Sequence, residues 1–93
     1  MNAYEVTFLF SQNEESFKAG LQKVKDEFTK AGATITKEDD LGIRTTAYPV
    51  KKQTKAHYYY FEMTANPASI LPMEKIFNIS GDILKYLFVR KEN

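Results

Sequence analysis

Residues 56–63 read AHYYYFEM, and this stretch decides how the rest of the chain is interpreted. Its aromatic content is typical of a β-strand. Successive side chains of a strand point to opposite faces of a sheet, so three consecutive tyrosines place aromatic rings on both faces. We expect residues with the parity of Phe61 to point inward. Residues of the other parity are then expected on the opposite, open face: Tyr58, Tyr60 and Glu62.

The segments around this strand have helix and strand patterns of their own. Residues 3–10 read as a strand with Val6, Phe8 and Phe10 on the inward parity, which leaves Glu5, Thr7 and Leu9 outside. After Asn13, a helix cap, apolar residues recur at helical spacing and end at Gly32, which is placed for a left-handed C-terminal turn: Phe17, Leu21, Val24, Phe28 and Ala31.

The second half of the chain repeats this alternation of strand and helix. Residues 33–48 read as one long strand with a bulge or bend at Leu41-Gly42, ended by Pro49 and followed by the basic loop VKKQTK. After the strand at 57–64, a helix is expected to be capped by Ser69, with Pro72 in its first turn. Residues 83–89, ILKYLFV, are the last predicted strand, with inward and outward residues by parity: Leu84, Tyr86 and Phe88 in, Lys85, Leu87 and Val89 out.

The order β-α-β-β-α-β predicts an α+β, ferredoxin-like sandwich over residues 1–93 as a single domain, in which two helices pack on one face of a four-stranded antiparallel sheet. Two helices cover one face only. The other face is therefore expected to carry exposed apolar residues among polar ones, and such a cluster usually marks an interaction site.

Composition excludes several classes of function. The chain has no cysteine and a single histidine, so it offers no thiolate metal site, no disulfide framework and little for a histidine-based nucleophile or metal site. It has no apolar run of membrane-spanning length, and its start, MNAYEVTF, lacks the features of a signal peptide. We expect a cytoplasmic protein with no membrane association, no cofactor, no metal and no small-molecule substrate.

Charge is distributed unevenly although the formal net charge is only +1. Residues 1–40 carry five lysines against eight acidic residues, whereas residues 41–61 have no acidic residue and four basic ones: Arg44, Lys51, Lys52 and Lys55. An acid-free basic segment of this length is a candidate contact for an anionic partner. The adjacent acids at 38–40 read as a solvated bend, with a divalent cation as the alternative.

Three functions can use a sheet of this kind. Stacking of single-stranded RNA on Tyr58 and Tyr60 is disfavoured, because the first strand presents Glu5, Thr7 and Leu9 where an aromatic ring is needed. An anion-binding enzyme is disfavoured too, because the loop after the first strand carries two acids and no arginine. The third function is that of a structural protein, which docks a partner on the open sheet face and contacts nucleic acid with its basic edge. This function uses both the apolar residues of the open face and the acid-free basic segment. An RNA-recognition-motif-like binder or a ligand-binding regulatory module remains the alternative.

The sequence resembles the bacterial small-subunit ribosomal protein number six family over nearly its whole length. The resemblance rests on several short segments in the family's order: Tyr4-Glu5, Leu41-Gly42-Ile43-Arg44, Ala47-Tyr48-Pro49-Val50, Ala56-His57-Tyr58 and the apolar last strand that ends at Arg90. It implies a non-enzymatic component of the small ribosomal subunit that binds the central domain of small-subunit ribosomal RNA. It also implies a heterodimer with the eighteenth small-subunit protein.

Carried onto this chain, the resemblance implies a set of RNA contacts, and strand parity gives the candidates for the protein partner. The RNA-facing candidates are Tyr4, Arg44, Tyr48, Lys51, Lys52, Arg90 and Lys91, with the basic residues on phosphates and Tyr48 on sugar or base. The candidates for the protein partner are the open-face residues Glu5, Leu9, Tyr58, Tyr60, Leu87 and Val89. The chain departs from the family pattern at Asn2-Ala3 and Thr45-Thr46, which weakens its set of RNA contacts and places more weight on the partner protein.

Overall fold

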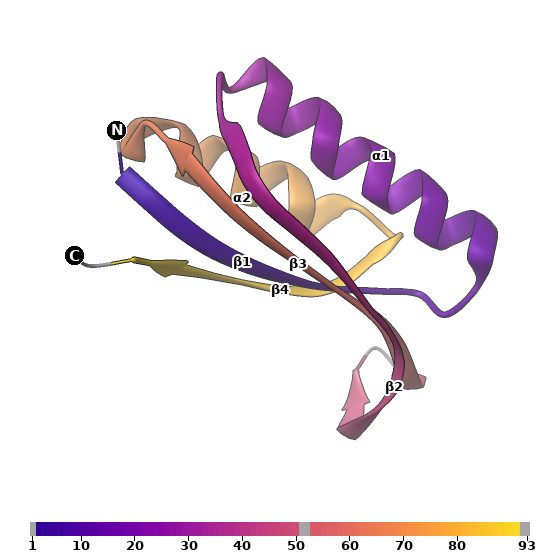
Figure 1. Ribbon diagram of the computed structural model, residues 1–93. Coiled ribbons are helices and arrows are strands. Elements are labelled where there is room, and N and C mark those ends of the chain that lie inside the picture. The colour runs from indigo at the N-terminus through magenta and orange to yellow at the C-terminus, as the bar shows by residue number, and fades with distance from the viewer. Residues whose placement is uncertain (1, 51–52, 92–93) are drawn as a thin grey trace.

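The fold was analysed in a computed structural model that describes residues 2–50 and 53–91, without the side chains of residues 47–50. Over these residues the elements run β1 (Asn2–Phe10), α1 (Glu14–Lys30), β2 (Thr34–Val50), β3 (Gln53–Ala65), the short 3-10 turn η1 (Pro67–Ser69), α2 (Ile70–Ile79) and β4 (Ile83–Arg90). The strands form one sheet in the order β2-β3-β1-β4, with antiparallel neighbours throughout. Figure 1 shows both helices on the same face of this sheet. The predicted ferredoxin-like α+β fold is confirmed.

Helix α1 begins and ends where the sequence predicted. Asn13 is its N-cap, and the Asn13 side chain accepts a hydrogen bond of 3.1 Å from the Ser16 amide. At the other end Gly32 adopts φ +73°, and the amide of Ala33 reaches back to the Phe28 carbonyl at 2.9 Å. The face between these caps buries Val24 and Phe28 against the sheet.

Strand β2 is long because a bulge lets it bend without losing its pairing to β3. The pairing shifts between Asp40 and Gly42, and Gly42 takes φ +80°, a left-handed conformation that favours glycine. The bend predicted at Leu41-Gly42 is therefore confirmed. Strand β2 continues to Val50 and β3 begins at Gln53, so most of the segment predicted as a loop is the end of a β-hairpin. Figure 1 shows this hairpin extending beyond the layer of the helices.

Helix α2 is preceded by a turn that was not predicted. Asn66 caps η1 by accepting a hydrogen bond of 2.9 Å from the Ala68 amide. Ser69 stands at the N-cap position of α2 as predicted, but its hydroxyl donates to the Asn66 carbonyl at 2.7 Å and makes no capping bond to the helix. Pro72 lies in the first turn, where a proline costs no intrahelical hydrogen bond.

The core lies between the sheet and the helices and is built mainly from aromatic rings. Phe8 is at its centre, with ring centroids 5.3 Å from Phe77 and 5.8 Å from Phe61, both edge to face. Along β3 the alternation is as predicted, because Tyr59, Phe61 and Met63 are buried while the residues between them are half-buried: Tyr58, Tyr60 and Glu62. The strand AHYYYFEM thus divides its tyrosines between the core and the open face.

Strand β4 corrects one of the predicted parities. Its register with β1 shifts by one residue, so that Phe10 pairs with Ile83 while Leu9 pairs with Lys85. Ile83 therefore joins the core, and Leu84, predicted to point inward, is buried outside the main core cluster. Tyr86 and Phe88 pack against the core as predicted. The extra residue between two paired positions is the physical reason for the change.

Candidate docking face and nucleic-acid interface

No helix of the described residues covers the other face of the sheet (Figure 1), and the strand register arranges the side chains of that face in rows. Residues paired across antiparallel strands point to the same face, so each row runs from β4 through β1 to β3. The rows are Val89–Glu5–Glu62, Leu87–Thr7–Tyr60 and Lys85–Leu9–Tyr58. All six candidates for the protein partner lie in these three rows.

Exposure on this face increases toward β4. Leu87 is 60% exposed and Val89 is 45% exposed, whereas Leu9, Tyr58 and Tyr60 are half-buried. The two exposed aliphatic residues of the edge strand pair with Thr7 and Glu5 of β1, and the half-buried apolar pair Leu9 and Tyr58 forms the neighbouring row, so the face carries apolar residues among polar ones. Surfaces of this kind are typical of interaction sites.

Two carboxylates mark one end of the open face. Glu5 and Glu62 stand directly opposite each other, and Glu62 forms ion pairs with Lys91 at 2.5 Å and Lys37 at 3.8 Å. The hydrogen bond from Lys91 holds the pKa of Glu62 below its usual value. Burial raises the pKa of Tyr60 to about 12, and both carboxylates add to this shift, so the tyrosine is a neutral hydrogen-bond donor at this end of the face.

The structure does not bring the RNA-facing candidates together. Arg44 is exposed and pairs with Ala56 on β3, whereas Arg90 is exposed at the far end of β4, opposite Tyr4. Tyr4 in turn pairs with Met63, seven residues along β3 from Ala56. At about 3.3 Å per residue, the two arginines are separated by ~23 Å along the strands. Lys51 and Lys52, and the side chain of Tyr48, lie outside the described part of the chain.

Tyr4 and Lys91 are held by other parts of the chain. Tyr4 is only 7% exposed and belongs to the core cluster, so most of its ring is withdrawn from any partner. Tyr4 has the same strand parity as Val6 and Phe8, so it points to the same face of the sheet. The ammonium of Lys91 is bound to Glu62, and its backbone amide donates to the Ala3 carbonyl at 2.9 Å. Arg44, Arg90 and Lys91 are the described candidates that are exposed, and of these Lys91 is held in an ion pair.

Comparison with known proteins identifies the family of this chain. Residues 3–90 match the family model described as "Ribosomal protein S6". The chain belongs to the ribosomal protein S6 family. It is 34% identical to the small ribosomal subunit protein bS6 of Treponema denticola over the full length of both chains. It is 32% identical to that of Helicobacter pylori, with all of this chain and 67% of the relative covered.

A solved structure supports the fold independently. The crystal structure of the 30S ribosomal protein S6 from Thermotoga maritima superposes with a TM-score of 0.88 at 22% identity, covering 97% of this chain and 87% of the other. Membership in the S6 family confirms that the chain is a structural protein of the small ribosomal subunit rather than an enzyme, and that its location is the ribosome in the bacterial cytoplasm. No helix in the described residues is long and apolar enough to cross a membrane.

The acidic residues at 38–40 have structural partners in this S6-family chain. Glu38 accepts a hydrogen bond of 2.6 Å from the Tyr59 hydroxyl and pairs with Lys25 of α1 at 2.7 Å. The hydrogen bond from Lys25, and to a smaller extent that from Tyr59, lowers the pKa of Glu38. Burial and the Glu38 carboxylate raise the pKa of Tyr59. Within the described residues no group of three His, Cys, Asp or Glu side chains is placed to hold a metal ion. Glu38 therefore joins β2, β3 and α1.

A second contact of this kind was missed by the sequence analysis. His57 points toward the helices, where its ring stacks on Phe17 of α1 with centroids 3.6 Å apart and planes 4° from parallel. Its Nε2 lies 2.5 Å from Oδ1 of Asp40. The parity of His57 predicted its inward direction, but no local pattern in the sequence identified Asp40 as its partner, because the bulge lies between them in the register.

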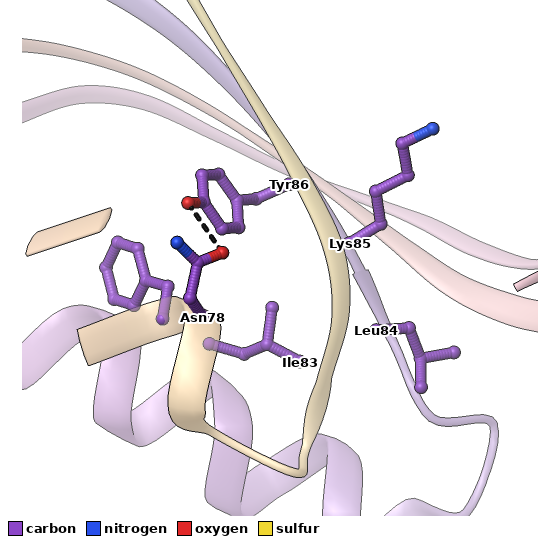
Figure 2. A pocket seen from close by; sticks show the side chains of 6 residues that line it. Asn78, Ile83, Leu84, Lys85 and Tyr86 are labelled. Carbon is purple, nitrogen blue, oxygen red and sulfur yellow. Dashed lines mark hydrogen bonds between the residues drawn. The ribbon is translucent and has the colours of Figure 1, made fainter. Parts of the chain in front are cut away.

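A hollow of about 350 Å³ lies between α2 and β4. Figure 2 shows Ile83 and Tyr86 turned toward Asn78 of α2, and Leu84 and Lys85 turned away from it. The Tyr86 hydroxyl donates to Asn78 Oδ1 at 3.0 Å, and burial raises the pKa of Tyr86. The lining residues are Phe77 and Asn78 of α2 and Ile83, Leu84, Lys85 and Tyr86 at the start of β4, which is a contact between a helix and the sheet.

Proposed function

We propose that this S6-family chain binds the central domain of small-subunit ribosomal RNA as a heterodimer with the eighteenth small-subunit protein. The observation that carries the proposal is the sheet face that the described helices leave open, on which apolar residues of three strands lie among polar ones: Leu9, Tyr58, Tyr60, Leu87 and Val89. Such a surface on a small domain needs a partner to remove it from water. The sequence resemblance to the S6 family supplies the identity of that partner.

The open face supports a protein partner rather than stacked RNA bases. Glu5 and Glu62 stand side by side on it, and carboxylates repel the phosphates of an RNA strand laid across the sheet. Strand β1 contributes Thr7 and Leu9 at the centre of the face, which offer no ring for stacking. The docking set proposed is Glu5, Leu9, Tyr58, Tyr60, Leu87 and Val89.

The basic hairpin supports an RNA contact away from that face's acidic end. Arg44 and Lys55 are exposed on the two strands of the hairpin, and the segment from 41 to 61 contains no acid. We assign to this hairpin the contacts expected of Arg44, Tyr48, Lys51 and Lys52, and to Arg90 a separate phosphate contact at the other end of the sheet. For Tyr4 and Lys91 we propose supporting roles, in the core and in the ion pair with Glu62.

Binding of a central-domain transcript, measured by fluorescence anisotropy over a range of salt concentrations, tests the proposal. We expect weak binding by the chain alone and tight binding by the heterodimer, because the partner adds phosphate contacts and couples the two equilibria. Equal affinity and equal salt slope for the chain and the heterodimer would contradict cooperative binding. Absence of binding by the heterodimer would refute the RNA assignment.

Two sets of variants separate the two surfaces. Charge reversal of Arg44, Lys51 and Lys52 should weaken RNA binding while heterodimer formation is kept. Tyr58→Asp combined with Tyr60→Asp should impair heterodimer formation while the free chain stays folded. If the charge reversals abolished both activities, the cause would be misfolding rather than loss of a phosphate contact.

A further inference from the structure

His57 connects helix α1 to the bulge of strand β2 through one side chain. One face of its ring lies parallel to Phe17 at 3.6 Å, and its edge carries Nε2 to within 2.5 Å of Asp40 Oδ1. An ionised carboxylate can only accept hydrogen bonds, so the imidazole must be the donor here. The side chain of His57 is 15% exposed and that of Asp40 is 52% exposed, so the imidazole side of this charge-assisted bond is largely buried while the carboxylate side is open to water.

Asp40 also binds the backbone of the bulge. The same oxygen, Oδ1, accepts a hydrogen bond of 2.9 Å from the Gly42 amide, at the residue that takes the left-handed conformation. Burial works against the charge of Asp40, yet the hydrogen bonds from His57 and Gly42 leave its pKa lowered. The carboxylate therefore holds the backbone at the point where β2 bends.

Arg44 lies on β2 just after this bend. Its Nε donates to the Leu41 carbonyl at 3.1 Å, so the guanidinium is itself oriented by the bulge. Beyond it Thr45 pairs with Lys55, and the hairpin runs past the layer of the helices (Figure 1). His57 is thus the link between the helix layer and the start of the hairpin that carries Arg44 and Lys55.

We propose that His57 is a positioning residue for RNA binding, which fixes the direction of the β2–β3 hairpin by clamping Asp40 against α1. This inference rests on the proposed RNA-binding function. It assigns to His57 and Asp40 no contact with RNA. Without the clamp the hairpin samples further directions. The apparent RNA affinity then falls in proportion to the fraction of molecules whose hairpin has the direction that binds RNA.

Substitutions at His57 separate its two contacts. His57→Phe keeps a ring to stack on Phe17 but removes the donor, and His57→Gln returns an N–H donor near the position of Nε2. Asp40→Asn keeps the volume of the side chain and removes the negative charge that strengthens both bonds, so it serves if a His57 variant folds poorly. Arg44→Ala is the comparison variant that removes a phosphate contact directly.

The first measurement uses the free chain and needs no RNA. Amide hydrogen exchange is followed at Gly42, with the amides of Val24 and Phe28 in α1 as reporters of global unfolding. The clamp predicts that His57→Phe accelerates exchange at Gly42 by about tenfold, the effect of losing a charge-assisted hydrogen bond, while α1 is unchanged. Unchanged exchange at Gly42 in both His57→Phe and Asp40→Asn would overturn the clamp.

The second measurement is RNA affinity of the heterodimer. His57→Phe should weaken binding of the central-domain transcript about tenfold with the salt slope and the heterodimer affinity unchanged, and His57→Gln should recover part of the loss. Arg44→Ala should instead reduce the salt slope by about 0.7 to 0.9. Wild-type affinity in His57→Phe would overturn the positioning role. A wild-type heterodimer that fails to bind the transcript would refute the proposed function itself, and the exchange experiment would still decide whether the clamp exists.

Discussion

Replacement of Leu87 by alanine tests the docking face with a magnitude that follows from the structure. Complete burial of a leucine side chain is worth about 1.5 to 3 kcal/mol, and Leu87 is 60% exposed in the free chain. Alanine retains only the first carbon of that side chain. We therefore expect Leu87→Ala to cost about 1 to 1.5 kcal/mol of binding free energy, which raises the dissociation constant of the heterodimer roughly 5- to 12-fold.

Leu71 provides a matched control. It is 61% exposed, but it lies on α2, on the covered side of the sheet. Isothermal titration calorimetry of both variants against the eighteenth small-subunit protein compares two leucine-to-alanine substitutions at side chains of nearly equal exposure. Urea unfolding of each free variant checks that the fold is kept. The reasoning is refuted if Leu87→Ala binds like the wild type, or if Leu71→Ala weakens binding to the same extent.

Three further outcomes concern the fold that holds these surfaces in place. Tyr59→Phe should lower the free energy of unfolding in urea by about 1 to 2 kcal/mol, because its hydroxyl donates to a carboxylate that is partly exposed. Glu38 has a lowered pKa in the folded state, so its contribution to the free energy of unfolding is present above its unfolded pKa and is lost as pH falls through its folded pKa. Glu38→Gln should therefore flatten the dependence of stability on pH below about pH 5. An unchanged dependence would contradict this. Gly20→Ala should destabilise the chain by about 1 kcal/mol despite better helix propensity, since the new Cβ would lie 2.8 Å from the buried ring of Phe10, whereas Gly81→Ala, with nothing within 4 Å, should stay within about 0.5 kcal/mol.

Strand periodicity was a reliable guide where one face of a strand is buried. The alternation in AHYYYFEM correctly assigned Tyr59 to the core and Tyr58 and Tyr60 to the other face, because a shift of one residue would have exposed Phe61 and Met63. The glycine at Gly42 likewise predicted the bend in β2, since a left-handed backbone is costly for other residues. These features are local, and local chemistry determines them.

Predictions that depended on distant segments were less successful. Ile83 and Leu84 are both aliphatic, so nothing in their own sequence indicates which joins the core; the shifted pairing with β1 decides it. The partners of Glu38 and Asp40 lie on other elements, Tyr59 and His57 among them, and no spacing along the chain predicts them. Tyr4 was predicted to face RNA from the family resemblance, but it shares the parity of Val6 and Phe8 and lies in the core.

The position of β4 in the sheet has a consequence for the order of events during synthesis. Leu87 and Val89 lie on the last strand of the described chain, and this strand pairs only with β1, the first to be made. The central strand β1 therefore keeps one edge unpaired until translation has passed residue 90. The β4 part of the proposed docking surface, Leu87 and Val89, does not form before that moment, so a ribosomal partner that recognises it would select chains in which β4 has been made.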